Sequence, residues 1–355
     1  MRVFILKPDA IGDFILSTGC IRLIARELGE KNLVIAVRAD VAPLAKNQFP
    51  EAEVIPLPLR QKRRILNVAT VNVINCLPAW IRLLTFRPDA SVCFRSMRAY
   101  LHTITFYLPR TQRRIACENL LLTHPRVRRP AVEKFAARFF KPTLIPYPKM
   151  GALPTDIEAN RLVTCELLQR QISASEIFPT LLPPRKVNVQ NRWLLCPFSS
   201  SIFRDYPAES WAETLILLLR HYPDAAIHLA AGPSQADRLQ DFARTLETAD
   251  LKKNITIDPP LLLPDFIQTI AEARLVLTVD TGTAHMACAL GSPAVIVCSG
   301  NQTGVWVPYS KNGLQKWLTP PDNLPKGEWR KYFTPEKIAA SARHVLSTGG
   351  ENFLG

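Results

Sequence analysis

The chain has 355 residues, of which 47% are hydrophobic, and its formal net charge is +14. Domains usually hold about 100 to 200 residues, so this length predicts two domains and excludes a single small binding module. No run of about 18 consecutive apolar residues is present, and Lys7, Pro8 and Asp9 interrupt the apolar start too early for a signal peptide. We therefore expect a cytoplasmic protein.

The first half of the chain alternates between strand and helix patterns. Strands are expected at residues 2–6, 33–37, 53–57 and 90–94, and helices at 14–28, 42–48, 73–86, 100–107 and 155–171. Such alternation predicts a parallel sheet covered by helices on both faces. The prolines between Phe178 and Val189 then indicate a semi-rigid linker.

After this linker the pattern starts again. Strands are expected at 192–196, 226–230, 255–257, 275–279 and 294–297, and helices at 207–221, 235–246, 265–273, 284–290 and 334–346. We therefore expect two Rossmann-like α/β/α domains, over residues 1–178 and 191–333, joined by a linker at 179–190. Residues 334–355 are expected to form a helix that packs back toward the first domain.

The basic residues are concentrated in the first half. Residues 1–150 contain 25 Lys and Arg against 10 Asp and Glu, a surplus of 15, whereas the remainder contains 19 against 20. This asymmetry indicates an anionic partner, and composition alone leaves nucleic acid, acidic lipid and phosphorylated substrates open. The basic clusters lack the interleaved aromatic residues of a nucleic-acid-binding motif, so nucleic acid is not expected.

The strongest local motif is the segment Asp280-Thr281-Gly282-Thr283-Ala284-His285. It lies between a predicted buried strand and a predicted helix, so unpaired N–H groups and the positive end of the helix are available to a phosphate. Its small residues allow the backbone to approach a ligand. The pattern by itself is shared by many structural turns.

Two segments together resemble the bacterial heptosyltransferase family, glycosyltransferase family 9. One is Asp280 to His285 with the following Leu290-Gly291-Ser292-Pro293, and the other is Lys7-Pro8-Asp9-Ala10-Ile11-Gly12-Asp13. That family adds heptose from ADP-heptose to the inner core of lipopolysaccharide. The resemblance implies a GT-B fold, in which two Rossmann-like domains face each other across a cleft, the first binding the acceptor and the second the nucleotide sugar.

The resemblance implies that Asp13 is the general base that takes a proton from the acceptor hydroxyl. A carboxylate at the tip of the first strand, next to Gly12, suits inverting displacement. The other interpretation is that Asp13 only caps the helix that follows. Residues expected to bind the anionic acceptor are Gly12, Arg60, Arg63, Arg64, Arg95 and Arg98.

A third similar segment runs from Ser199 to Arg204, where the hydroxyls of Ser199 and Ser200 suit the donor diphosphate and Arg204 suits the leaving group. A polar surface loop is the alternative. His285 is expected either to contact the donor, to orient Asp280 or to make a structural hydrogen bond. The complete set of expected donor-binding residues is Ser199, Ser200, Arg204, Gln235, Asp237, Leu261, Asp280, Thr281, Gly282, Thr283 and His285.

No metal and no cofactor are expected. No Asp-x-Asp pair follows a predicted strand, no His and Cys cluster has ligand spacing, and the eight cysteines are scattered without a Cys-x-x-Cys pair. The expected partners are an ADP-linked sugar and an anionic glycolipid or phosphorylated saccharide, with peripheral contact at the cytoplasmic face of the inner membrane.

Departures from the family pattern leave alternatives open. Thr283 replaces a residue that is commonly apolar, and the segment from Ser299 to Tyr309 lacks the common Gly-Pro-Thr-Asp-Pro sequence. The donor sugar is therefore heptose or a different sugar. A nucleotide-sugar epimerase or hydrolase on the same scaffold is the other alternative.

Overall fold

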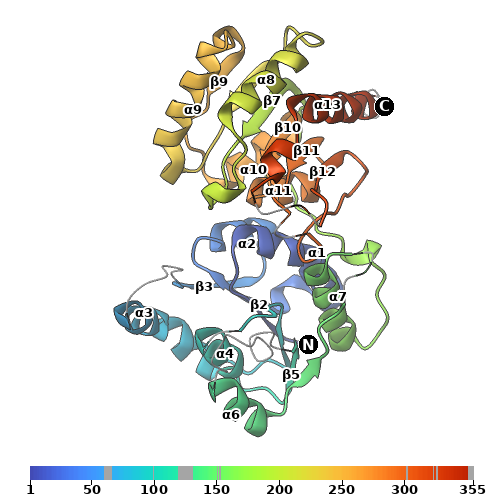
Figure 1. Ribbon diagram of the computed structural model, residues 1–355. Helices are drawn as coiled ribbons and strands as arrows, with labels where there is room; N and C mark the ends of the chain where they lie inside the picture. The colour runs from blue at the N-terminus through green and yellow to red at the C-terminus, as the bar shows by residue number, and fades with distance from the viewer. Residues whose placement is uncertain are drawn as a thin grey trace. The chain divides into compact units, whose positions relative to one another are not determined.

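A computed structural model of the chain describes residues 1–59, 66–98, 100–118, 131–149, 151, 153–300, 303–322, 324 and 327–350. The chain forms two compact units, Met1–Pro179 and Thr180–Gly355 (Figure 1). Their boundary falls at the start of the segment expected as a linker. Each unit contains a six-stranded parallel sheet with helices, which confirms the predicted fold class.

The sheet of unit 1 has the strand order β3-β2-β1-β4-β5-β6. Its strands are β1 (Val3–Lys7), β2 (Leu33–Arg38), β3 (Glu53–Leu57), β4 (Ala90–Cys93), β5 (Arg113–Cys117) and β6 (Thr143–Ile145). The central strand β1 is buried along its whole length and pairs with β2 and β4. The chain adds strands on one side of β1 and then on the other, so the switch point of the sheet lies between β1 and β4.

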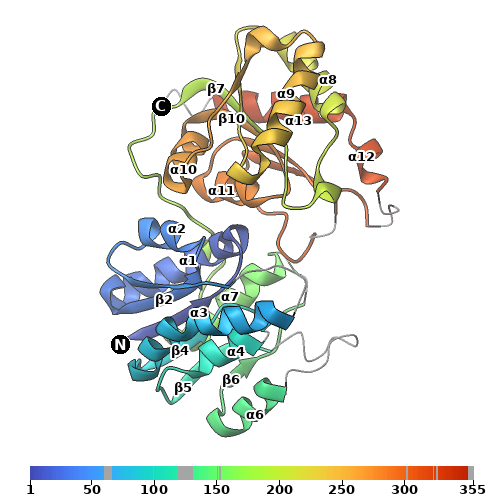
Figure 2. The ribbon, with the colours of Figure 1, turned by 90° about the vertical axis from the view of Figure 1, so that its left-hand side faces the viewer.

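The helices of unit 1 form two layers. Helices α3 (Leu66–Thr85), α4 (Tyr100–Tyr107) and α6 (Ala131–Phe140) lie side by side and share one apolar core with the sheet (Figure 2). Helices α1 (Ile11–Leu28) and α7 (Thr155–Leu168) pack together, and α2 (Ala42–Gln48) contacts β2 and β3. The short helices are η1 (Glu30–Asn32) and η2 (Ser175–Ile177).

Gly19 permits the close contact between α1 and η2. A Cβ at Gly19 would lie 2.1 Å from the carbonyl oxygen of Ile177. No side chain fits at that distance, so glycine is required for this packing. The first helix is thereby held to the end of unit 1.

Unit 2 repeats the same topology, with the order β12-β11-β10-β7-β8-β9. Its strands are β7 (Gln190–Cys196), β8 (Ala226–Leu229), β9 (Ile255–Ile257), β10 (Ala273–Val279), β11 (Ala294–Val297) and β12 (Gln315–Leu318). The switch point lies between β7 and β10, which pair in parallel.

One large core in unit 2 joins helices to the sheet, and Trp329 of α12 (Trp329–Tyr332) is part of it. Helices α8 (Ala208–Leu219), α9 (Ala236–Thr248) and α13 (Pro335–Gly350) contribute to it, whereas α10 (Leu263–Glu272) and α11 (Gly282–Leu290) pack against each other outside it. The remaining helices are η3 (Ile202–Arg204), η4 (Pro233–Gln235) and η5 (Lys252–Asn254).

The final helix belongs to unit 2, whereas the sequence predicted a segment that packs toward the first domain. Ile338, Ala342 and Val345 of α13 are buried in the same core as Trp211 and Leu218 of α8. These side chains recur at helical spacing, so they form one apolar face that unit 2 covers.

Candidate functional site

The candidate donor site lies where β7 and β10 end. The hydroxyl of Thr278 in β10 donates to the carbonyl oxygen of Cys196 in β7 at 3.0 Å, which joins the two strand ends. Ligands of open α/β sheets bind outside the carboxyl ends of the strands at a switch point. The structure thus brings together the Ser199 loop after β7 and the Asp280 loop after β10, as the sequence predicted.

Arg204 connects these two loops. Its Nη1 donates to the carbonyl oxygen of Asp280 at 3.1 Å, and its Nη2 donates to Oγ of Ser200 at 2.9 Å. The side chain is partly buried in η3. Its positive charge therefore lies at the end of β10, close to the start of α11.

Helix α11 begins without a side-chain cap. Thr281 is the N-cap residue in an extended conformation, and its side chain makes no capping hydrogen bond. The first turn is Gly282, Thr283 and Ala284, of which Thr283 is buried and Gly282 partly exposed. The N–H of Ala284 donates to the carbonyl oxygen of Thr281 at 3.0 Å, which leaves the N–H groups of Gly282 and Thr283. Such groups carry the positive end of the helix dipole, so they favour an anion.

Asp280 itself is buried. Its N–H donates to the carbonyl oxygen of Val297 at 3.1 Å, and its carbonyl accepts from Arg204. The residue thus holds the end of β10 against β11 while its backbone positions the arginine. Donor binding by Asp280 stays a prediction, and it is based on the place of this residue at the end of β10.

His285 makes a structural hydrogen bond, one of the three roles that the sequence left open. Its Nδ1 lies 2.9 Å from the hydroxyl of Tyr309, and the two rings stack with centroids 5.7 Å apart. Burial, with a smaller effect from Arg204, lowers the pKa of His285 to about 4. The imidazole is therefore neutral at neutral pH, and it adds no positive charge to the site.

Ser199 and Gln235 shape the loop after β7. The hydroxyl of Ser199, expected to meet the diphosphate, donates to the carbonyl oxygen of Ser201 at 2.6 Å and accepts from the N–H of Ser201 at 3.0 Å. Nε2 of Gln235 donates to the carbonyl oxygen of Ser199 at 2.8 Å. Both side chains therefore fix the loop from within.

Three residues that the sequence analysis did not select also support this loop. Oδ1 of Asp205 accepts from the N–H of Ser199 at 2.7 Å, and its other oxygen pairs with Arg238. Arg330 donates from Nε to the carbonyl of Asp205 at 2.9 Å and from Nη2 to that of Ile202 at 2.8 Å. Arg330 lies 125 residues from Asp205 in sequence, so no local pattern indicates its role.

The remaining donor candidates follow the neighbouring strands. Asp237 is exposed in the first turn of α9, after β8, and Leu261 is partly buried after β9. Because β8 and β9 continue the sheet beyond β7, both residues lie at the same edge as Arg204. Their expected contacts with the ribose and the base stay predictions.

In unit 1, Asp13 is the third residue of α1, directly after the β1 loop. In the described part of the chain, no side chain caps the start of α1 by a hydrogen bond, so the structure gives no support to the alternative that Asp13 only caps the helix. Burial raises the pKa of Asp13, and the positive charge of Lys7 opposes that rise. A carboxylate with a raised pKa binds a proton more readily, which suits the predicted role as a base.

Lys7 is the centre of a buried ion network that the sequence analysis did not predict. Its Nζ lies 3.4 Å from Asp9 and 3.3 Å from Asp156, and donates to the carbonyl oxygen of Phe94 at 2.7 Å. Arg95 also pairs with Asp9. The network joins β1, the loop after β4 and α7 beside Asp13.

The predicted acceptor residues differ in their exposure to solvent. Gly12 is partly exposed in the first turn of α1, and Arg95 is partly buried, which lowers its pKa to about 10. Arg98 is fully buried, and its Nη1 donates to the carbonyls of Arg95 at 2.9 Å and Cys117 at 2.8 Å. The prediction that Arg98 contacts the acceptor is wrong, because its side chain is buried on backbone carbonyls of the interior. Arg60, Arg63 and Arg64 lie outside the described residues.

Comparison with known proteins assigns the family. Residues 119–331, more than half of the chain, match the model of glycosyltransferase family 9 (heptosyltransferase). The chain belongs to glycosyltransferase family 9. It is accordingly a glycosyltransferase of the heptosyltransferase type, and the epimerase or hydrolase alternative is set aside. Among curated proteins, none matches its sequence.

Solved structures share the fold of this family 9 glycosyltransferase. E. coli heptosyltransferase WaaC with ADP has a TM-score of 0.70 at 17% identity, covering 97% of this chain and 100% of that one. E. coli ADP-heptose lps heptosyltransferase II has a TM-score of 0.70 at 14% identity, with 99% and 100% covered. A family 9 enzyme from Veillonella parvula has a TM-score of 0.66 at 11% identity, with 98% and 97% covered. The fold is therefore GT-B.

Proposed function

We propose that this glycosyltransferase moves heptose from ADP-heptose to a hydroxyl of a lipopolysaccharide core or a related anionic glycan, with inversion and without a metal. The main support is the position of Arg204, which donates hydrogen bonds to Asp280 and Ser200 beside the uncapped start of α11. A guanidinium and a helix N-terminus together suit a diphosphate. The ADP-containing relative supports the choice of nucleotide.

In the proposed reaction, the carboxylate of Asp13 takes the proton of the acceptor hydroxyl. The acceptor oxygen forms a bond to the anomeric carbon while the bond from that carbon to the diphosphate oxygen breaks, so ADP leaves with the electron pair. Arg204 and the first N–H groups of α11 stabilise the negative charge of the leaving group. A single displacement of this kind inverts the anomeric configuration.

The basic surplus of the first 150 residues supports an anionic acceptor. Arg95 is the described arginine that remains a candidate contact, together with Gly12. Contact with the cytoplasmic face of the inner membrane is part of the proposal. Among the described residues, no helix combines the length and the apolar character needed to span a bilayer.

The test of the base is Asp13→Asn, which keeps the size of the side chain. We expect transfer to fall by about 100- to 10,000-fold, the usual contribution of a general base, while ADP binding stays unchanged. Asp89→Asn is the matched control, because Asp89 is an exposed aspartate of the same unit. Undiminished transfer by Asp13→Asn would refute the proposed mechanism.

The same variant separates catalysis from stability. The folded-state pKa of Asp13 is raised, so its ionised form destabilises the fold at pH values above that pKa. Asparagine removes this cost, and the melting temperature at neutral pH should not fall. Lost transfer at an unchanged melting temperature then reports on chemistry alone.

The donor is tested by thermal shift with ADP, UDP and GDP. A nucleotide at about 100 times its dissociation constant stabilises the fold by about 2.7 kcal/mol. We expect ADP to give the largest shift, and transfer assays with ADP-heptose against other ADP-sugars then identify the sugar. A larger shift with UDP or GDP would contradict the proposed donor.

A further inference from the structure

Helix α3 is apolar on its outward side as well as on its inward side. Cys76, Trp80 and Leu83 are buried in the core of unit 1. The outward stripe is exposed, and its residues are Ile74 at 57%, Leu77 at 44%, Ile81 at 62% and Leu84 at 45%. A helix that is apolar on its solvent side indicates a surface with a partner.

Helix α6 presents a second exposed apolar group. Phe135 is 68% exposed and Phe139 is 63% exposed, and their rings lie one helical turn apart with centroids at 4.6 Å. Phe140 is also 44% exposed. Two adjacent phenylalanine rings in contact with solvent are unfavourable on a protein surface, because each ring has a large apolar area.

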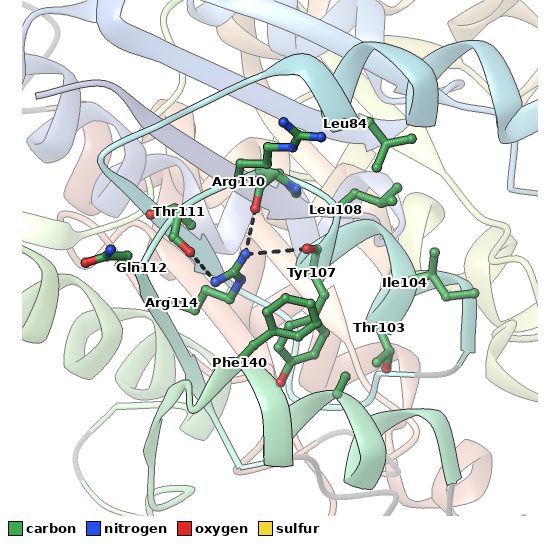
Figure 3. A pocket seen from close by; sticks show the side chains of 12 residues that line it. Leu84, Thr103, Ile104, Tyr107, Leu108, Arg110, Thr111, Gln112, Arg114 and Phe140 are labelled. Carbon is green, nitrogen blue, oxygen red and sulfur yellow. Dashed lines mark hydrogen bonds between the residues drawn. The ribbon is translucent and has the colours of Figure 1, made fainter.

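A pocket of about 690 Å³ connects the two helices. Leu84 of α3 lies at one side and Phe140 of α6 at another, with Ile104 and Tyr107 of α4 between them (Figure 3). Leu84 and Phe140, which are two of the exposed apolar residues, therefore line the same pocket. We call Ile74, Leu77, Ile81, Leu84, Phe135 and Phe139 the α3/α6 face.

The surroundings of this face are strongly basic. From Glu53 to Lys141 the sequence contains 17 Lys and Arg against four acidic residues. One of the four, Glu53, pairs with Arg82 of α3 at 3.0 Å. The carboxylate of Asp89 accepts from the backbone N–H of Arg2 at 2.6 Å. Four further exposed cations lie on α6 or in the segments that follow α3, α4 and α6, namely Arg87, Arg110, Arg138 and Lys141.

We propose that the α3/α6 face docks on a bilayer surface that contains anionic lipids. Aromatic and aliphatic side chains insert at the headgroup boundary, and flanking Lys and Arg are attracted to acidic headgroups. Complementary charge selects this partner, since cations outnumber carboxylates in the segment that carries the apolar side chains of the face. The inference rests on the proposed function, in which the acceptor is a glycolipid. It adds which surface of the protein contacts the lipid.

The test is flotation of the full chain with vesicles of phosphatidylethanolamine and phosphatidylglycerol, compared with vesicles of phosphatidylcholine. We expect binding to the anionic vesicles that weakens as salt is raised. The double variant Ile81→Ser with Phe139→Ser should bind at least about tenfold more weakly. Leu182→Ser is the control, because Leu182 is a 52% exposed leucine of unit 2.

Both substituted side chains are exposed, so the double variant should melt within about 2 °C of wild type. Equal vesicle binding by wild type and double variant would overturn the proposal, as would wild-type protein that fails to bind anionic vesicles. Self-association that the double variant abolishes, without vesicle binding, would assign the face to a second copy and also overturn it.

Vesicle binding requires neither donor nor a reactive acceptor, so it is independent of the proposed reaction. Transfer to a delipidated, water-soluble acceptor tests the reaction separately, and the double variant should retain it. Failure of transfer with intact vesicle binding would count against the proposed function alone. Failure of vesicle binding with intact transfer would count against the α3/α6 face alone.

Discussion

Replacement of Lys7 by methionine tests the buried ion network beside Asp13. Nζ of Lys7 lies 3.4 Å from Asp9 and 3.3 Å from Asp156. At an effective dielectric constant of about 20, each attraction is worth about 5 kcal/mol before desolvation is subtracted. The desolvation of the ammonium offsets much of this, and removal of one partner of a buried pair costs about 3–5 kcal/mol in practice.

We therefore expect Lys7→Met to lower the free energy of unfolding of unit 1 by about 3–5 kcal/mol. For a unit of this size each kcal/mol corresponds to about 2–4 °C, which gives a decrease of about 6–20 °C in melting temperature. Differential scanning calorimetry of the full chain measures it. Lys31→Met is the control, because Lys31 is exposed in η1. A Lys7→Met protein with the melting temperature of wild type would refute the conclusion that the network stabilises unit 1.

Three further predictions concern other parts of the chain. Arg204→Gln should lower kcat/KM by about 10- to 1000-fold and weaken ADP binding, because it removes the charge next to the diphosphate, and Arg204→Lys should recover part of the loss; unchanged kinetics would contradict the donor site. Gly19→Ala should lower the free energy of unfolding by about 3 kcal/mol or more, since its Cβ would lie 2.1 Å from the carbonyl oxygen of Ile177. Gly232→Ala is the control, because a Cβ there meets open space, and it should change the free energy of unfolding by less than about 1 kcal/mol. Chemical denaturation measures both values. The folded-state pKa of His285 is about 4, below the value of about 6.5 in an unfolded chain. As the pH falls from about 6.5 to about 4, the unfolded chain therefore takes up the proton first, and up to about 3 kcal/mol of the free energy of unfolding is lost. His285→Gln should flatten this dependence, and an identical slope in the variant would show that His285 does not cause it.

Much of the fold was predictable because hydrophobic periodicity and turn residues agree. Helix α2 and strand β3 occupy the expected residues 42–48 and 53–57. Helix α7 ends at Leu168 rather than at residue 171 because Gln169 adopts a left-handed conformation, with φ of 54°. Helix boundaries of this kind depend on backbone conformations that a sequence does not reveal.

Strand β5 was missed because its arginines resemble a surface cluster. Arg114 is buried, and its guanidinium donates to the carbonyls of Thr111 and Pro109 and lies 4.8 Å from the ring centroid of Phe140. A buried arginine needs carbonyl oxygens as hydrogen-bond acceptors, and the folded chain brings these acceptors together. Composition therefore cannot indicate that such an arginine is buried. The same reason explains why Arg98 was expected at the surface.

The two motifs of the candidate site were predictable because each is a short segment after a strand. What the sequence could not provide was the support behind them. Arg330 and Lys7 act through partners that are 125 and 149 residues away, respectively. Such contacts form only when the sheet is complete, and single-sequence patterns extend over one element at most.

The pairing of β7 with β10 has a consequence for how the protein is made. The bond between Thr278 and Cys196 joins residues 82 positions apart, and Arg330 reaches the loop after β7 from still later in the chain. During synthesis the Ser199 loop therefore emerges long before the partners that shape it, and loop closure over this distance is entropically unfavourable until the intervening elements fold. Nucleotide binding should consequently appear only in nearly full-length chains, which makes it a direct readout of completed folding in truncation series.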